Sequence, residues 1–417
     1  MSKPRSEKRI LKTVLGNFAL VMLGVGIALG LTELLLRTYP HWVPGVVRVD
    51  PPVRRVEASI DESYDVRLSN GDLFYYMAGT IVPLAPDEDQ IVAQVHLTTD
   101  ENGFRNPLPE KPTYGMVALG DSFTVATNAA YPWPQKLAEY SGIDVLNLGV
   151  EGAGPQRELE VLRQYGLKKR PQWVILAFFE GNDLYDAGGY ETANPFILTR
   201  VVSYLLGQSR EAWQERRSGS AHAAIAPSYR YPITLSIKDT NLEMAFFSSY
   251  IAWLSVSRKA IESSENYRLV SEKILEVQEI CEAMDARFLL VYVPTKLHVY
   301  LPYLNDTETL ARVFIDVPMI EVGEEGYLQF TNQTVTPELT SQNMDEQADL
   351  LAEFAAGHNI VYLDLTSTFQ EEAGKGAELF YPFDTHWNQH GHDLAAQTIA
   401  KYIEDMLTVT ASKKPGN

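Results

Sequence analysis

Short apolar runs alternate with amphipathic helical segments from Tyr114 onward, and this alternation limits the fold more than any other feature. The apolar runs span residues 114–120, 143–149, 172–179, 287–293 and 360–365, and the helical segments span residues 132–142, 155–167, 265–286, 345–357 and 391–407. Strands that alternate with helices form βαβ units, whose strands pair in parallel. The pattern therefore predicts an α/β fold with a central parallel sheet.

Two long stretches interrupt the alternation, at about residues 184–263 and 298–343. Interruptions of this length in a compact domain usually carry function or structure of their own. In the first, the apolar patterns over residues 196–208 and 241–261 predict helices. We expect them to form a cap over the sheet.

The N-terminus carries a second strong signal. Residues 1–12 hold five basic side chains against Glu7, and the run from Thr13 to Thr32 has no charged residue. About 20 apolar residues cross a bilayer as a helix, and flanking positive charge stays in the cytoplasm. We predict a basic cytoplasmic tail, an uncleaved transmembrane anchor over residues 13–36 and a chain that is otherwise outside the cytoplasm. A cleaved signal peptide is the rival reading, but its apolar region is typically shorter.

Residues 37–110 are predicted to be an extracytoplasmic extension, followed by the main domain at residues 111–410. Within the extension, Asn70-Gly71 lies between two β-rich runs and predicts a hairpin. Residues 90–101 read as a strand that leads into a turn at Asn102-Gly103.

Composition excludes two classes of function. The formal net charge is -19, and the basic residues show no stripe, so nucleic acid is not an expected partner. Cys281 is the only cysteine, which rules out an intrachain disulfide and a cysteine-based metal site.

Distinctive polar residues and glycines follow four of the predicted strands. Ser122 follows the first strand, Gly149, Gly152 and Gly154 follow the second, Asn182 and Asp183 follow the third, and Asp384 and His386 follow the last. Ligands of open α/β sheets bind beyond the carboxyl ends of the strands. These residues are therefore expected to meet at one edge of the sheet.

Each of these residue types suits a role in acyl transfer. A serine hydroxyl needs a base to become a nucleophile, so His386 is expected to take the proton of Ser122 and Asp384 to orient the imidazole. The Ser122 N–H, the Gly152 N–H and the Asn182 amide are candidate oxyanion donors. No metal or organic cofactor is required by this chemistry.

Simpler interpretations compete with these roles. Ser122 could be a helix cap beside Asp121, and Asp183 is expected to cap the turn after the third strand. His386, His390 and His392 could together bind a metal, although that would leave Ser122 and Asn182 unexplained.

Other polar and aromatic residues near the blocks are given structural roles. His390 and His392 are expected to steady the loop of His386 through hydrogen bonds. Trp387 is expected to pack beside the base, with substrate stacking as the lesser alternative. Glu151 and Glu180 are interpreted as solvated loop residues, with repulsion of anionic substrates as the lesser alternative.

The four blocks GDSFT, GVEGAG, GND and DTHWN resemble those of the SGNH (GDSL-type) hydrolase superfamily, in the superfamily's order. The resemblance implies a flavodoxin-like three-layer α/β/α fold and Ser-His-Asp ester chemistry. It also points to a membrane-anchored cell-envelope branch, which carries a lead-in similar to NGFRN. Many members have aspartate three residues before the histidine, where this chain has Phe383. The DTHW block is similar to that of polysaccharide O-acetyltransferases, whose block order differs.

These observations predict a membrane-anchored serine esterase in the periplasm or outside the cell. The expected substrate is an ester-bearing small molecule or an O-acylated envelope or exported glycan, with lipid esters as the next choice. A polysaccharide O-acetyltransferase that uses the same residues is the alternative. The second alternative is a catalytically silent envelope protein that binds glycans or proteins. Envelope proteins are candidate partners whether or not the protein is an enzyme.

Overall fold

The computed structural model describes residues 5–39, 59–73, 90–191, 198, 201 and 232–412. The chain divides into two compact units. One comprises residues 1–53 and 192–220, and the other comprises residues 54–191 and 221–417. All of the predicted site residues belong to the second unit.

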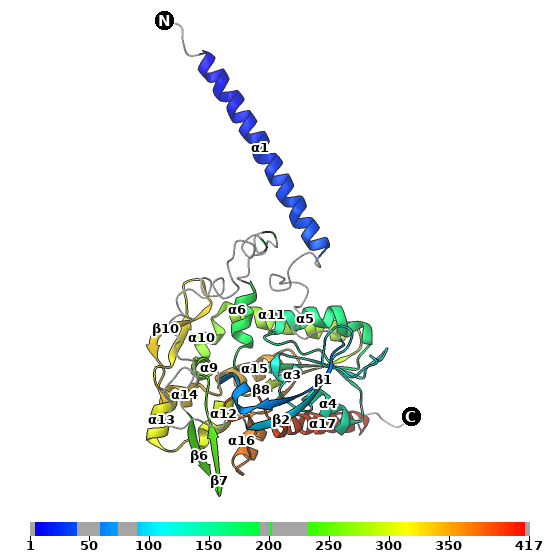
Figure 1. The fold of residues 1–417 in the computed structure, drawn as a ribbon, viewed down its shortest axis with the longest axis vertical. Coiled ribbons are helices and arrows are strands. Elements are labelled where there is room, and N and C mark those ends of the chain that lie inside the picture. Colours follow the sequence, from blue (N-terminus) through cyan, green and yellow to red (C-terminus); the bar gives the residue numbers. More distant parts are fainter. Residues whose placement is uncertain are drawn as a thin grey trace. The chain divides into compact units, whose positions relative to one another are not determined.

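A five-stranded parallel sheet forms the centre of the second unit (Figure 1). Its strands are β3 (Met116–Leu119), β4 (Val145–Asn147), β5 (Trp173–Phe179), β8 (Arg287–Val293) and β11 (Val361–Asp364), and they lie side by side in the order β11-β8-β5-β3-β4. In chain order this is 2-1-3-4-5, which is the flavodoxin-like arrangement. The predicted α/β fold with a parallel sheet is confirmed.

Helices cover both faces of this sheet, so β3 and β5 are apolar throughout. On one side lie α5 (Pro155–Val161) and α11 (Glu265–Ala283), and on the other lie α4 (Trp133–Ser141) and α17 (Gln389–Ser412) (Figure 1). Every residue of β3 and β5 is buried, as expected for strands with two covered faces. α4 ends at Gly142, whose φ of 68° lies in the left-handed region that glycine adopts easily.

From residue 54 onward, the extension belongs to the same unit as the sheet. β1 (Asp61–Arg67) pairs antiparallel with β2 (Ile91–Thr98), and β2 leads into a turn where Gly103 has a φ of 81°. The hairpin predicted at Asn70-Gly71 is wrong. Residues 68–70 form a short 3₁₀ turn, and Gly71 has a φ of -60°, whereas a two-residue hairpin turn of the predicted kind needs positive φ. From residue 74, the β-rich run predicted after it lies outside the described residues.

Both interruptions carry secondary structure. The described part of the first begins in α6 (Asp183–Glu191). It continues with the hairpin β6 (Ile233–Ile237) and β7 (Thr240–Met244), then α9 (Ser248–Leu254) and α10 (Arg258–Glu262). The helix predicted over residues 241–261 is therefore wrong in its first residues, because burial alternates with period two along the hairpin. The helix predicted over residues 196–208 lies almost entirely outside the described residues.

The second interruption contains helices and a second hairpin. Its elements are α12 (Lys296–Tyr300), α13 (Thr307–Val313), β9 (Pro318–Val322), β10 (Leu328–Thr334) and α14 (Pro337–Asn343). α15 (Glu346–Gly357) follows and returns the chain to β11.

In the first unit, α1 (Arg5–Thr38) is a continuous helix over the predicted anchor. Within the part of the chain that the structure describes, no helix combines the length and apolarity needed to cross a membrane. The transmembrane helix predicted at residues 13–36 is thus not confirmed.

Candidate active site

A tight turn presents Ser122 at the carboxyl end of β3. Gly120 has a φ of 152°, and a Cβ on it would lie 2.2 Å from the Thr124 Oγ1 atom, so this position requires glycine. Asp121 then caps the short helix α3 (Ser122–Val125) by accepting a hydrogen bond from the Phe123 N–H at 2.9 Å. The cap is therefore Asp121 and not Ser122, which leaves the Ser122 hydroxyl free of a capping role.

The loop after α16 (Thr366–Ala373) brings His386 to Ser122. The His386 Nε2 atom lies 2.8 Å from the Ser122 Oγ atom, and the His386 Nδ1 atom lies 2.6 Å from the Asp384 Oδ1 atom. Asp384 Oδ1 also accepts the His386 backbone N–H at 2.8 Å. Both predicted hydrogen bonds of the histidine are present, in the geometry that a nucleophile, a base and an orienting carboxylate require.

The carboxylates around His386 make it a strong base. Burial by itself would lower the pKa of His386, but the Asp384 carboxylate, helped by Asp72 and Asp121, raises it to about 9. The pKa of Asp384 is lowered, because the attraction of His386 and of Lys296 outweighs the effect of burial. Imidazolium at this position is therefore stabilised, as proton transfer from Ser122 requires.

The two remaining oxyanion candidates lie in the loops that follow β4 and β5. Gly152 has a φ of 59° in its turn. The Asn182 Nδ2 atom donates to the Asp186 Oδ2 atom at 2.8 Å, which leaves at most one amide hydrogen for a substrate oxygen. β3, β4 and β5 are parallel neighbours, so these loops leave the sheet at the same edge as Ser122.

Three buried carboxyl groups lie among the elements behind these loops. Asp121, Glu158 and Asp183 are each at most 2% exposed, and each keeps an oxygen without a hydrogen-bond partner among the described residues. Burial raises the pKa of Asp121 to about 6 and holds the pKa of Glu158 and of Asp183 well above the usual range. Asp183 accepts the Phe179 N–H at 2.8 Å, so the capping role predicted for it is present in the structure.

Glu180 is not a solvated loop residue, so that prediction is wrong. It is 1% exposed and lies 2.6 Å from the Nδ1 atom of His298, which is 0% exposed. Glu180 also accepts the Tyr292 hydroxyl at 2.6 Å and the Thr295 N–H at 2.8 Å. This buried cluster fixes the chain immediately before Gly181 and Asn182.

The aromatic and histidine residues beyond His386 have structural roles. Trp387 is 1% exposed and packs between Phe123 and Phe369, each with its ring centroid 5.0 Å away, so it is not placed to stack on a substrate.

His392 differs from the prediction. His392 is 1% exposed, its ring nitrogens have no partner among the described residues, and burial lowers its pKa to about 3. The hydrogen bonds predicted for it are therefore absent there, and it contributes by packing against Trp387. His390 is exposed.

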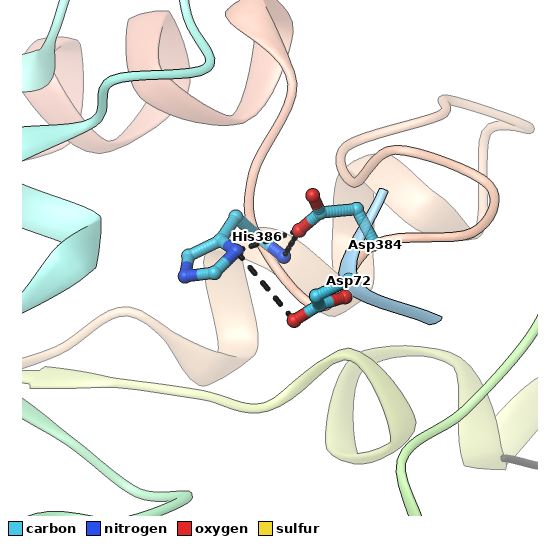
Figure 2. Close-up of side chains that lie close together, drawn as sticks. All are labelled: Asp72, Asp384 and His386. Carbon is cyan, nitrogen blue, oxygen red and sulfur yellow. Dashed lines mark hydrogen bonds and ion pairs between the residues drawn. The ribbon is translucent and has the colours of Figure 1, made fainter. Parts of the chain in front are cut away.

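Lys296 and Asp72, which no sequence motif marks, hold the loop that carries Asp384 and His386 by hydrogen bonds. The Lys296 ammonium donates to the Tyr381 and Pro382 carbonyls at 2.7 Å and to the Asp384 carbonyl at 3.2 Å. Burial lowers the pKa of Lys296 to about 7. Asp72 accepts the Thr385 N–H and hydroxyl, and its Oδ2 atom lies 4.0 Å from the His386 Nδ1 atom (Figure 2).

The NGFRN lead-in supports the turn of Ser122. Arg105 is 6% exposed, and its guanidinium donates to the Ala126, Ala129 and Ala130 carbonyls that follow α3. Asn106 accepts the Asn147 N–H and donates to the Asn147 carbonyl, both at 2.9 Å. These roles depend on contacts between distant segments, so no local sequence motif indicates them.

Asp72, Asp384 and His386 also form the one group of histidine and acidic side chains, within the described ranges, whose ligand atoms all lie within 4.8 Å. The set of His386, His390 and His392 proposed as an alternative metal site does not come together. In Figure 2 the Nδ1 atom of His386 faces Asp384 directly, and that hydrogen bond already uses the nitrogen a metal would need.

Comparison with known proteins supports the superfamily. Residues 328–415 match the family model described as "SGNH hydrolase-like domain, acetyltransferase AlgX". A search of curated proteins finds no match.

Among solved structures, the chain is similar to three hydrolases at low identity. The first is an α/β hydrolase from the metagenome of Lake Arreo, Spain, at 12% identity and a TM-score of 0.35, covering 69% of this chain and 93% of that one. The second is a variant of Axe2, an acetylxylan esterase from Geobacillus stearothermophilus. It is 13% identical with a TM-score of 0.32, and the match covers 69% of this chain and 93% of that one. The third is a GDSL-like lipase from Bacteroides thetaiotaomicron VPI-5482. It is 10% identical with a TM-score of 0.30, and the match covers 70% of this chain and 88% of that one.

The family match over residues 328–415 is to an SGNH hydrolase-like domain, and together with the flavodoxin-like sheet it indicates an enzyme of the SGNH hydrolase type. The superfamily expected from the four sequence blocks is confirmed. Its chemistry is that of an acyl-ester hydrolase or an acetyltransferase.

Proposed function

We propose that this protein is a membrane-anchored, extracytoplasmic serine enzyme that moves an acyl group from an ester through an acyl-serine intermediate. The observation that carries the proposal is the hydrogen-bonded series Ser122 Oγ–His386 Nε2 at 2.8 Å and His386 Nδ1–Asp384 Oδ1 at 2.6 Å. Ser122 is the nucleophile, His386 the general base and Asp384 the residue that orients the imidazole.

In the first half of the reaction, the Ser122 Oγ atom forms a bond to the acyl carbon while His386 takes the hydroxyl proton. The tetrahedral oxyanion is held by the Ser122 N–H, the Gly152 N–H and the remaining amide hydrogen of Asn182. His386 then gives the proton to the leaving alcohol, and the acyl group stays on Ser122. In the second half, water or another hydroxyl attacks the acyl-serine while His386 takes its proton. The bond between the acyl carbon and the Ser122 Oγ atom then breaks, and His386 returns the proton to that oxygen.

Hydrolysis of an O-acylated envelope or exported glycan is the first form of this proposal. Transfer of acetyl to a polysaccharide hydroxyl is the second, and the acetyltransferase description of the model that matches residues 328–415 favours it specifically. Both forms need the same residues and differ in which acceptor reaches the acyl-serine.

The anchor and location are supported by sequence and exposure. The uncharged run from Thr13 to Thr32 follows a basic cluster. In α1, Leu20, Val21 and Leu23 are 70%, 62% and 63% exposed, which is unfavourable in water. Alkaline carbonate extraction and protease accessibility of intact cells test this part. Release of the protein from the membrane fraction at high pH would refute the anchor. Degradation of the second unit only after lysis of the inner membrane would refute the extracytoplasmic location.

The enzymatic part is tested with full-length protein in detergent, using p-nitrophenyl acetate and an acetylated oligosaccharide. Mass spectrometry of the protein after mixing should show an acetyl group on the peptide that contains Ser122, and Ser122→Ala should show none. Release of acetate indicates hydrolysis, and acetyl gain on a non-acetylated oligosaccharide indicates transfer. Equal background rates in wild type and Ser122→Ala would instead support a binding protein without catalysis.

A further inference from the structure

Asp72 reaches the candidate active site from a segment far from the four sequence blocks. It lies between the 3₁₀ turn at residues 68–70 and Leu73, whereas Thr385 and His386 lie more than three hundred positions later in the chain. Figure 2 shows its carboxylate on the same side of the imidazole as Asp384. The series of Ser122, His386 and Asp384 is complete without it, so its presence calls for an explanation.

The backbone around Asp72 is fixed against the catalytic loop. The Leu73 N–H donates to the Phe383 carbonyl at 3.0 Å, and a Cβ on Gly71 would lie 2.3 Å from that same oxygen. Leu68, Leu73, Ala245 and Phe383 form a small buried apolar cluster beneath this contact. Gly71 therefore allows a close approach that holds Asp72 in one place.

The Asp72 side chain then makes two direct bonds to the catalytic loop. Its Oδ1 atom accepts the Thr385 N–H at 2.9 Å, and its Oδ2 atom accepts the Thr385 hydroxyl at 2.6 Å. The same Oδ2 atom lies 4.0 Å from the His386 Nδ1 atom. Its side chain is 42% exposed, so water screens this charge only in part.

We propose that Asp72 is a positioning residue of the acyl-transfer reaction, which holds Thr385 and His386 in place and stabilises the His386 imidazolium as a second carboxylate. This inference rests on the proposed function. It gives the extension a part in catalysis, since Asp72 adds a second negative charge beside the His386 imidazolium to that of Asp384.

The other charged groups near His386 do not replace this role. Asp384 is bonded to the imidazole, Asp121 lies on the Ser122 side, and the Lys296 ammonium lies behind Asp384. His392 is held neutral by burial. Among the two carboxylates on the Nδ1 side, Asp72 is thus the one whose removal leaves the direct Asp384 hydrogen bond intact.

Asp72→Asn tests the inference, because asparagine keeps the shape and can still accept the Thr385 N–H. The first measurement is the titration of selectively labelled histidine by NMR in the full-length protein, with His386→Gln to assign the signal. We expect the His386 midpoint to fall by about one pH unit, as for a partly screened charge near 4 Å. At a pH above both midpoints, where His386 is unprotonated in wild type and variant alike, the weaker base should lower kcat with p-nitrophenyl acetate by up to about tenfold, with little change in KM.

Two further variants separate this role from a structural one. Asp65→Asn removes an equally negative, exposed residue of β1 and should leave the His386 midpoint unchanged. Asp72→Glu keeps the charge and should restore most of the midpoint even if Asp72→Asn is poorly folded. An unchanged midpoint in Asp72→Asn, or an equal shift in Asp65→Asn, would overturn the inference. The NMR result does not need turnover, so a wild type without esterase activity would refute the proposed function and still leave this test decisive.

Discussion

The buried pair of Glu180 and His298 offers a quantitative test of what holds the loop that carries Asn182. Both side chains are at most 1% exposed, and Glu180 accepts three hydrogen bonds, one of them from His298 at 2.6 Å. Replacing His298 by alanine would leave the Glu180 charge buried beside two neutral donors. Loss of one partner of a buried ion pair costs about 3–5 kcal/mol. We therefore expect His298→Ala to lower the free energy of unfolding by about 3–5 kcal/mol.

The pH dependence of this loss has a definite sign. Burial would lower the pKa of His298, but the Glu180 carboxylate outweighs it and raises the pKa to about 10. The unfolded-state pKa is about 6.5. Because the folded value is the higher one, the stabilisation by His298 is complete below about pH 6.5 and is lost as the pH rises through about 10. The difference in stability between wild type and His298→Ala should shrink over that range.

Urea unfolding of the full-length protein in detergent, followed by circular dichroism at several pH values, measures this effect. Arg268→Ala is a matched control, since Arg268 pairs with Glu272 at 2.5 Å with both side chains 51% exposed, and it should lower the free energy of unfolding far less than His298→Ala does. Glu180→Gln added to His298→Ala should recover part of the loss. Equal losses in His298→Ala and Arg268→Ala, or a loss that does not depend on pH, would refute the reasoning.

Three other changes have defined outcomes. The rate constant kcat/KM for p-nitrophenyl acetate should rise with pH through about 9, because His386 must be unprotonated to act as a base and its pKa is raised to that value; a pH-independent rate from 6 to 10 would contradict this. Asp384→Asn should lower kcat by about 10⁴-fold while the fold is kept, measured by the same assay beside circular dichroism. Lys296→Met should lower kcat by up to about 100-fold, because the loop of Asp384 loses three hydrogen bonds and shifts; a kcat within twofold of wild type would show that the loop holds its position without them.

Local sequence was sufficient for the sheet and for the main candidate residues. Each apolar run from Tyr114 onward became a strand of the parallel sheet, because strands covered on both faces must be apolar along their length. Ser122 and Asn182 each follow a strand directly, and His386 follows the last strand after α16. Parallel strands end at one edge, so chain order indicated that these residues would meet. The hydrogen bonds of His386 to Ser122 and Asp384 agree with that expectation, and the catalytic roles stay predictions.

Only the tertiary structure determined which residues contact each other over long distances in the chain. Glu180 looked like a solvated loop residue, yet it is buried and paired with His298 of α12. Asp72 lay beside an apparent hairpin turn, yet its segment runs to Phe383 and Thr385. Patterns in sequence report which residues are buried and how the backbone turns. They do not report which distant side chain meets a buried charge, because that pairing is fixed only when the layers pack and each buried polar group must find a partner.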